Sequence, residues 1–212
     1  MGIVPEDRPD QSSPARRTAF RVAVDMDGVL ADLDGALRNR RHETRDSHGV
    51  ARRVVDAVKD VLTTAGAEHV ALWEEIRQVD SFWESLEETE PECVARLAKV
   101  AREHQWEVIF LTRRPEVTGD TSQRQTQRWL QARGFELPTV FVVQGSRGQI
   151  AAALDLHAVV DDDLENCLDV AALSNARPIL VSRTTKRPAL EGLNIEVVST
   201  IDECLRALLA LE

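Results

Sequence analysis

Two aspartates near the start of the chain have the spacing of a catalytic pair. Asp25 and Asp27 follow the apolar run at residues 22–24 and precede Gly28, where a buried strand would end in a turn. Side chains two positions apart on a strand point the same way, so one carboxylate is suited to act as nucleophile or metal ligand and the other as acid and base. The chemistry that we expect from this pair is phosphoryl transfer.

A calcium loop is the alternative interpretation of the same D-x-D-G pattern. Calcium loops supply further oxygen ligands and a glutamate farther along the chain. Here the next residues are Val29, Leu30 and Ala31, whose side chains offer no ligand. The pattern therefore disfavours calcium.

Candidates for phosphate binding follow two other predicted strands. Thr112 comes after the apolar run 109–111, and its hydroxyl, the adjacent Arg113 and nearby backbone N–H groups could hold phosphate oxygens. Arg147 lies in a glycine turn after the next strand, and a guanidinium binds phosphate bidentately. Taken alone, these positions have plainer explanations, a threonine that caps a loop and a surface arginine.

Three consecutive acids, Asp161, Asp162 and Asp163, come directly after another apolar run. Like charges at close range raise one another's pKa, so a hard cation with oxygen ligands is the economical explanation for the cluster. Mg²⁺ prefers one or two carboxylates with water and substrate phosphate, which suits Asp25 together with one acid of this cluster. A helix N-cap with favourable first-turn charges is the alternative, and the two roles are compatible.

The elements that would position these candidates alternate between strands and helices from residue 106 onward, which indicates an α/β fold with a parallel sheet. Near-continuous apolar strands imply helices on both faces, as in a doubly wound, Rossmann-like sheet, whose ligands bind at the carboxyl ends of the strands. Gly134 is placed to end a helix over 121–133, and a short helix is expected to begin near Gln149. The predicted strands cover 107–111, 139–143, 158–160, 178–181 and 195–198.

Three parts of the chain differ in composition. Residues 1–18 are polar and lack the apolar core of a secretory signal, so we expect a flexible tail. Residues 34–105 have helical character without strand alternation, which predicts a small helical cap inserted after the first strand. Residues 19–33 and 106–212 would then form the core. The basic run 38–42 either meets an anionic substrate or is a solvated helix face.

Composition and charge narrow the classes of function. The 212 residues, 43% hydrophobic and 29% charged, suit one soluble domain with an insertion, and no apolar stretch is long enough to cross a bilayer. A formal charge of -10 argues against general affinity for nucleic acid, although one basic pocket can still bind one phosphate. The three cysteines form no C-x-x-C pair and are expected to stay reduced in a cytoplasmic protein. The sequence does not decide between a monomer and a homodimer.

Taken in chain order, these groups resemble the haloacid dehalogenase superfamily. Its pattern is a D-x-D after the first strand, a Ser or Thr after the second, then a basic residue and a late acidic pair. The resemblance spans residues 20 to about 182 and implies a Rossmann-like core, a Mg²⁺ cofactor and a phosphatase that forms an aspartyl-phosphate. The matching residues are Asp25 with Asp27, then Thr112, Arg147, and Asp161 with Asp162.

Within that superfamily the chain is most similar to the 5'(3')-deoxyribonucleotidase group. Residues 25–32 read D-M-D-G-V-L-A-D, as that group has them, and 81–86 resemble the cap segment that places aromatic side chains beside the nucleobase. The resemblance implies that Phe82 or Trp83 stacks on the base; packing inside the cap is the alternative role. Arg147 departs from the lysine usual in that group. The Thr-Arg-Arg-Pro sequence after the second predicted strand also resembles the phosphatase half of polynucleotide kinase/phosphatases.

The resemblance further implies a mechanism. Asp25 attacks the phosphorus of a bound monophosphate, while Asp27 protonates the leaving alcohol and later activates water. Mg²⁺ is expected at the carboxylates of Asp25 and Asp162 and at the Asp27 carbonyl, with Asp161 in support. The expected substrate is a small phosphorylated molecule, foremost a nucleoside monophosphate. A phosphatase for another small phosphomonoester or a nucleic-acid 3'-phosphate is one alternative, and a catalytically silent module that binds a nucleotide or a protein is another.

Overall fold

Six parallel strands form the sheet of this protein. The computed structural model describes residues 19–47, 73–183 and 192–212, and in these ranges the strands lie in the order β3-β2-β1-β4-β5-β6. The first strand therefore has β2 on one side and β4 on the other, which makes this the point where the strand order reverses. The strand bounds are β1 Arg21–Asp25, β2 Glu107–Thr112, β3 Thr139–Val142, β4 Ala158–Asp161, β5 Arg177–Val181 and β6 Glu196–Val198.

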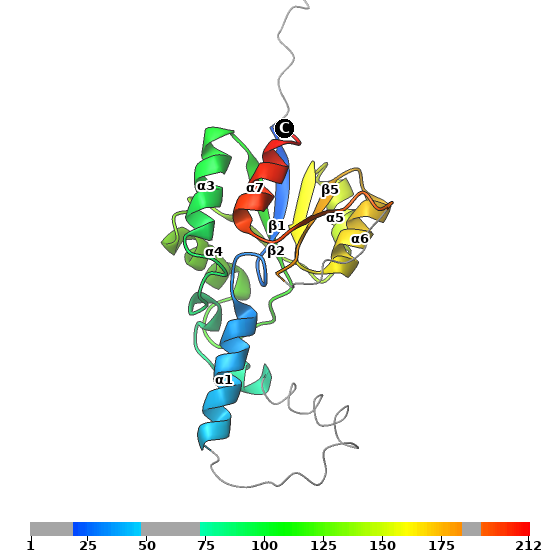
Figure 1. The fold of residues 1–212 in the computed structure, drawn as a ribbon. Coiled ribbons are helices and arrows are strands. Elements are labelled where there is room, and N and C mark those ends of the chain that lie inside the picture. Colours follow the sequence, from blue (N-terminus) through cyan, green and yellow to red (C-terminus); the bar gives the residue numbers. More distant parts are fainter. Residues whose placement is uncertain (1–18, 48–72, 184–191) are drawn as a thin grey trace, which may run out of the picture.

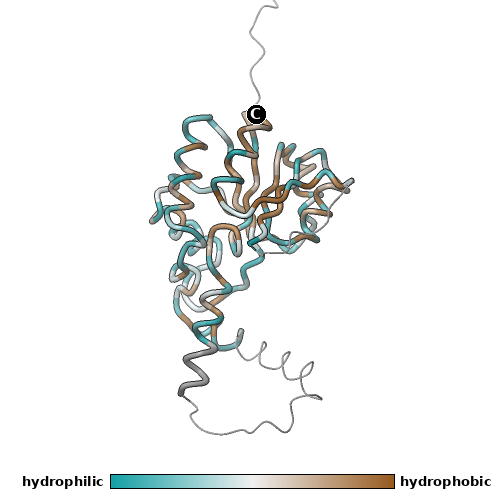
Figure 2. The backbone as a smooth tube through the Cα atoms, in the orientation of Figure 1, coloured by the Kyte–Doolittle hydropathy of each residue, from teal (hydrophilic) through white to brown (hydrophobic). Residues whose placement is uncertain are grey.

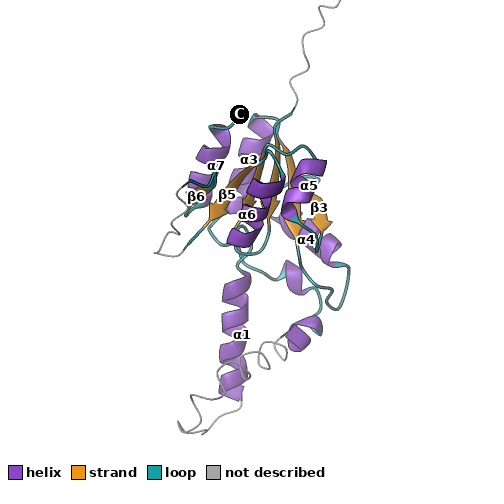
Figure 3. Ribbon diagram, turned by 90° about the vertical axis from the view of Figure 1, so that its right-hand side faces the viewer, coloured by secondary structure: helices purple, strands orange, loops and turns teal. Residues whose placement is uncertain are grey.

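Helices cover both faces of the sheet, as expected for a doubly wound fold (Figures 1 and 3). One face carries α3 Cys93–Glu103, α4 Ser122–Ala132 and α7 Ile201–Leu209, and the other carries α5 Arg147–Ala153 and α6 Leu164–Leu173. Alternate residues of one strand face the two layers: Val22 and Val24 pack with the first group of helices and Ala23 with the second. All three are at most 2% exposed. Figure 2 shows hydrophobic segments concentrated in the middle of the molecule, where the strands lie.

The segment between β1 and β2 contains the predicted cap. Helix α1, Leu33–Ser47, projects away from the carboxyl end of the sheet, and a short 3₁₀ helix, η1 Phe82–Glu84, follows farther along (Figure 1). The last helix of the predicted insertion, α3, instead lies in the layer over the sheet, beside α7. The part that stands away from the sheet therefore ends before residue 93. The expected tail, residues 1–18, lies outside the described residues.

Capping side chains explain where two helices begin. Thr121 accepts a hydrogen bond from a backbone N–H at the start of α4, and Gly134 follows the end of that helix with φ of 92°, the left-handed conformation expected there. Ser146 caps α5 in the same way, so this helix begins at Arg147, two residues before the predicted start at Gln149. Within the described ranges, no helix has the length and apolar character needed to span a bilayer.

Candidate active site

The carboxyl ends of three adjacent strands meet at one place. Asp25 is the last residue of β1, Thr112 the last of β2 and Asp161 the last of β4, and β1 pairs with both neighbours. Asp27 and Asp162 follow in the turns beyond these strands. Parallel strands end at the same edge of a sheet, so residues far apart in the sequence become neighbours here.

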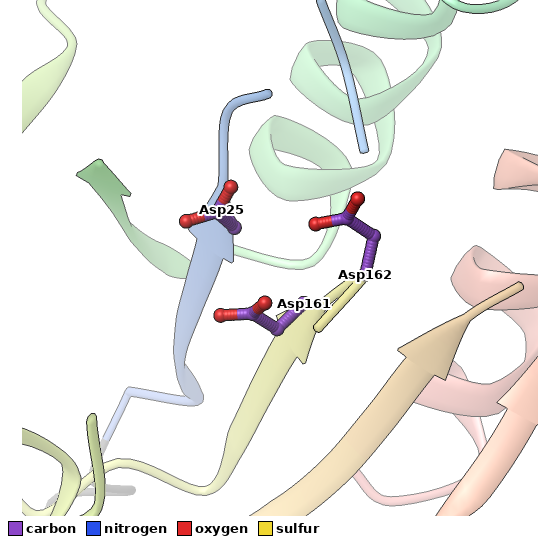
Figure 4. Close-up of side chains that lie close together, drawn as sticks. All are labelled: Asp25, Asp161 and Asp162. Carbon is purple, nitrogen blue, oxygen red and sulfur yellow. The ribbon is translucent and has the colours of Figure 1, made fainter. Parts of the chain in front are cut away.

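Three carboxylates converge into a group that could hold a metal ion. Asp25, Asp161 and Asp162 each offer an oxygen, and these oxygens all lie within 4.8 Å of one another (Figure 4). The donor set, carboxylate oxygens alone, suits a hard cation such as Mg²⁺. The carboxylate of Asp27 does not belong to this group, and its metal contact in the sequence analysis was through its backbone carbonyl.

Burial and mutual repulsion raise the pKa values of the carboxyl groups in this cluster. Burial raises the pKa of Asp25 well above its ordinary value, and the charge of Asp161 raises it further. Burial also raises the pKa of Asp161. The pKa of Asp162 rises to about 7, first through burial and then through the charge of Asp161. A bound cation would relieve this repulsion, since each carboxylate would gain an opposite charge.

Gly28 allows Asp162 to reach the turn after β1. Its φ is +85°, a conformation that side chains disfavour, and a Cβ there would lie 1.9 Å from the Asp162 Oδ2. The two turns that carry the acids can therefore approach each other only with glycine at this position.

Arg147, the first residue of α5, reaches the carboxylate of Asp25. Its side chain is 1% exposed, and Nη2 donates to Asp25 Oδ1 at 2.8 Å, while Nε lies 3.6 Å from Asp161 Oδ2. Among the described residues, neither Nε nor Nη1 has a hydrogen-bond acceptor. Buried cationic N–H groups without acceptors are costly, and the oxygens of a phosphate beside Asp25 would satisfy them.

The start of α5 holds Arg147 in place. Asp169 on α6 accepts hydrogen bonds from the Ser146 hydroxyl at 2.7 Å and from the Gly148 backbone N–H at 2.9 Å. These bonds lower the pKa of Asp169, the bond from Gly148 most of all. Residues on both sides of Arg147 are thus tied to the neighbouring helix.

Thr112 and Arg113 have different neighbours. Thr112 is buried, and its hydroxyl donates to Asp27 Oδ2 at 3.3 Å. The guanidinium of Arg113 turns to Asn166, donating to its Oδ1 at 3.0 Å, and the Asn166 amide donates to both oxygens of Asp161. The structure therefore brings Thr112 to the aspartate pair, whereas Arg113 reaches the site through Asn166, a residue that the sequence analysis did not single out.

Arg114 is a second buried residue that the sequence analysis missed. Its Nε and Nη2 donate to the two oxygens of Asp27 at 2.6–3.0 Å, and its Nη1 donates to Thr126 Oγ1 at 2.8 Å. The signal was the pair of arginines after an apolar run. A sequence does not indicate which of two adjacent arginines turns inward, because that depends on the path of the loop.

Phe82 and Trp83 lie in the packed interior, at 1% and 0% exposure. Their rings meet edge to face with centroids 5.0 Å apart, and the Trp83 indole N–H donates to the Pro115 carbonyl at 3.1 Å. The guanidinium of Arg114 also lies over the Trp83 ring, 4.8 Å from the ring centroid. In the structure both rings are covered by protein, which agrees with packing, the alternative role, and stacking on a nucleobase stays a prediction.

A cavity of about 420 Å³, lined mostly by polar and charged residues, opens beside the acidic group. Gly28 and Asp162 form the side next to that group, and Arg38, Thr89 and Arg183 line other parts. Of the basic run 38–42, Arg38 therefore borders the site. Hydrogen bonds from Arg183 to the carbonyl of Gly28 and to Thr89 connect the cavity walls.

No protein-family model matches the sequence, and no curated protein matches it. Solved structures do match. A β-phosphoglucomutase-like protein from Thermotoga maritima aligns over 91% of this chain and 100% of its own, with 17% identity and a TM-score of 0.59.

Two further structures agree with the first. A HAD family hydrolase from Deinococcus radiodurans R1, solved with bound phosphate and sodium, aligns over 91% of this chain and 96% of its own at 14% identity and a TM-score of 0.59. A haloacid dehalogenase-like hydrolase from Xanthomonas campestris covers the same shares at 15% identity and a TM-score of 0.55. The fold is that of the haloacid dehalogenase-like hydrolases. At these identities the likeness concerns the fold, and the finer similarity to deoxyribonucleotidases stays a proposal.

Proposed function

We propose that this protein is a Mg²⁺-dependent phosphomonoesterase that works through an aspartyl-phosphate intermediate. The single observation that carries the proposal is the surroundings of Asp25. Its carboxylate belongs to a group of acids suited to a hard cation and accepts a hydrogen bond from a buried arginine, Arg147, which has two N–H groups free of acceptors in the described protein. A cation and a guanidinium beside the same carboxylate would provide the positive charge that an attack on an anionic phosphate requires.

Two chemical steps follow from the two aspartates. In the first, an oxygen of Asp25 bonds to phosphorus as the bond to the leaving oxygen breaks, and Asp27 gives that oxygen its proton. In the second, Asp27 takes a proton from water, whose oxygen attacks the phosphorus and releases Asp25. The hydrogen bond from the Asp27 backbone N–H to Asp25 Oδ2, at 3.1 Å, orients the nucleophile between these partners.

The remaining residues hold the phosphate and the cation. Asp25 and Asp162, with the carbonyl of Asp27, would bind Mg²⁺, and Asp161 would support them from its bonds to Asn166. The ion supplies charge neutralisation between the nucleophile and the phosphate. Arg147 and the N–H groups near Thr112 would bind the equatorial oxygens. The phosphate and sodium in the Deinococcus structure support a phosphate-binding role for this fold.

For the substrate, we propose a nucleoside monophosphate, with 5'-nucleotidase activity as the leading form. The match of residues 25–32 to the deoxyribonucleotidase pattern supports it. A different small phosphomonoester is the second candidate. The cavity favours that candidate because most of the described residues that line it are polar or charged and none is aromatic, while Phe82 and Trp83 are covered. The net charge of -10 weighs against a nucleic-acid 3'-phosphate.

The test is phosphate release from a panel of esters, with Mg²⁺ and with a chelator. The panel holds deoxynucleoside and ribonucleoside monophosphates, sugar phosphates, p-nitrophenyl phosphate and a 3'-phosphorylated oligonucleotide. We expect metal-dependent release from nucleotides, and release confined to another ester would change the substrate while keeping the mechanism.

Asp25→Asn gives the matched control, because it keeps the shape of the side chain and removes the nucleophile. We expect turnover to vanish while the circular dichroism spectrum and melting temperature show a folded protein. An active Asp25→Asn variant would rule out the aspartyl-phosphate. A folded wild type that releases no phosphate from any ester would favour a silent binding module.

A further inference from the structure

Arg114 is a buried arginine that pairs with Asp27, the proposed acid and base. Its side chain is 0% exposed and follows the end of β2 by two residues. All three guanidinium nitrogens have acceptors: Asp27 takes Nε and Nη2, and Thr126 takes Nη1. A buried cation is tolerated only where its charge and N–H groups are satisfied, and the carboxylate of Asp27 meets that need.

The two buried arginines of the site differ in this respect. Arg147 touches Asp25 through one nitrogen and keeps two nitrogens without an acceptor among the described residues. Every guanidinium nitrogen of Arg114 already has an acceptor. Arg147 is therefore suited to bind substrate oxygens, and Arg114 is suited to fix the side chain of Asp27.

The packing around Arg114 leaves it one orientation. The ring of Trp83 covers it at 4.8 Å, and Trp83 is itself anchored by its backbone N–H to the Gln125 side chain, at 3.1 Å, and by its indole N–H to Pro115. Thr126 accepts from Arg114 and donates to the Ser122 carbonyl at 2.7 Å. Side chains of η1 and α4 thus hold the guanidinium from two sides.

We propose that Arg114 is a positioning residue for Asp27 and that Trp83 and Thr126 hold it in place, so that the acid and base of the reaction is oriented by the packing of η1 against α4. The inference rests on the proposed phosphatase function. Asp27 Oδ1 accepts the short bond from Arg114 Nη2, at 2.6 Å, whereas the contacts of Oδ2 with Arg114 Nε and the Thr112 hydroxyl are longer, at 3.0 Å and 3.3 Å. The Thr112 hydroxyl can rotate to accept instead of donate, so Oδ2 is the oxygen suited to carry the proton that the leaving oxygen needs. The arrangement also gives Trp83 a role other than contact with a nucleobase.

The test separates proton transfer from phosphate binding by the leaving group. p-Nitrophenolate leaves without a proton, whereas an alkoxide requires one, so a misplaced acid slows only the alkyl ester in the first step. For Arg114→Gln we expect kcat for the alkyl ester that the wild type hydrolyses to fall about 100-fold. With p-nitrophenyl phosphate we expect a burst of one equivalent of p-nitrophenol at nearly the wild-type rate, then slow turnover, because Asp27 must also activate the water.

A matched control removes a similar arginine elsewhere. Arg133 lies over Trp129 at 4.1 Å and donates to the Leu86 carbonyl at 2.7 Å, with no contact to the aspartates. Arg133→Gln should lower the melting temperature without any difference between the two esters. Arg114→Lys keeps the charge but cannot bond both oxygens in the same plane, and we expect it to fall between wild type and Arg114→Gln.

Thr126→Val and Trp83→Phe serve if Arg114→Gln does not fold, since each loosens Arg114 and leaves its charge in place. Both should show the same pattern in a weaker form, a first step slowed for the alkyl ester and nearly unchanged for p-nitrophenyl phosphate. Equal losses in the rate of this first step for the two esters, or a rise in KM with kcat unchanged, in a wild type that is active, would overturn the positioning role alone. A folded wild type inactive on every ester would overturn the phosphatase proposal, and this inference with it.

Discussion

Among single residues, Gly28 is the one whose replacement should disturb the site most directly. Any Cβ at this position would meet the Asp162 carboxylate at 1.9 Å and would have to adopt a φ of +85°. We expect Gly28→Ala to lower the free energy of unfolding by about 1 kcal/mol and to reduce Mg²⁺-dependent activity at least tenfold, because Asp162 must move away. Chemical denaturation measures the first effect, and activity measured over a series of Mg²⁺ concentrations measures the second.

Gly145 provides the control for that substitution. A Cβ there meets nothing within 4 Å, and its φ is not in the left-handed region. Gly145→Ala should therefore leave both Mg²⁺ affinity and activity near wild type. If Gly28→Ala binds Mg²⁺ as tightly as Gly145→Ala does, the role given to Asp162 is wrong.

The acidic group also predicts how Mg²⁺ stabilisation changes with pH. The folded-state pKa of Asp162, about 7, lies above its ordinary value of 3.8, so its contribution to stability is complete below about pH 4 and is lost as pH rises through 7. The residue keeps solvent contact, which moderates the loss. Because protons compete with the cation, Mg²⁺ should raise the melting temperature by a few degrees at pH 8 and hardly at all at pH 5. Equal shifts at the two pH values would contradict the proposed ligands.

Which site residues can be found from sequence depends on what fixes their direction. Asp25 and Asp161 end apolar strands, and a parallel sheet brings such ends together, so their meeting follows from pattern and topology. Arg114 and Trp83 are different, because loop and 3₁₀ conformations decide whether their side chains point inward. That information is absent from periodicity, and the stacked pair becomes visible only in three dimensions.

Among the elements, α5 depends on close contact with α6. A Cβ on Gly148 would lie 2.3 Å from the Asp169 carbonyl oxygen and 2.8 Å from the Leu173 Cβ. Gly148→Ala should therefore force the two helices apart, at a cost of about 1–3 kcal/mol in unfolding free energy. Since Arg147 precedes this glycine, KM for the phosphate ester should rise as well. Chemical denaturation and steady-state kinetics measure the two effects.

Gln149→Ala is the companion variant for α5. The Gln149 residue is exposed on the same helix, so its loss should change neither KM nor unfolding free energy appreciably. A Gly148→Ala protein as stable as this companion would show that α5 and α6 can separate at no cost.

Element bounds show where sequence patterns succeed. The predicted strands over 107–111 and 158–160 each end one residue short of the observed β2 and β4, and the residues added are Thr112 and Asp161. Apolar runs identify strands well, but a polar residue at the end of a strand looks like a loop. Helix α3 packs beside α7 in the layer over the sheet, and helical character alone does not tell a helix that covers the sheet from one in an insertion.

Across the whole molecule, the three cysteines offer a direct test of packing. Cys93, Cys167 and Cys204 are free and buried, on α3, α6 and α7. Burial raises the pKa of the Cys93 thiol to about 11 and that of Cys204 to about 12, and it raises the pKa of Cys167 as well. The thiolate is the reactive form. A thiol-specific reagent at pH 8 should thus modify none of them in native protein and all three after unfolding, and fast modification of the native protein would contradict this packing.

The strand order has a consequence for how the chain folds during synthesis. Strand β1 is made first, yet one of its neighbours comes about 85 residues later and the other about 135 residues later, as in the bond from Arg21 to His157. At typical rates of translation the apolar residues of β1 wait on the order of ten seconds for their second neighbour. We expect a nascent chain that is stalled before β4 to bind chaperones through residues 21–25. A chain that is stalled only after α7 has emerged from the ribosome should no longer bind them.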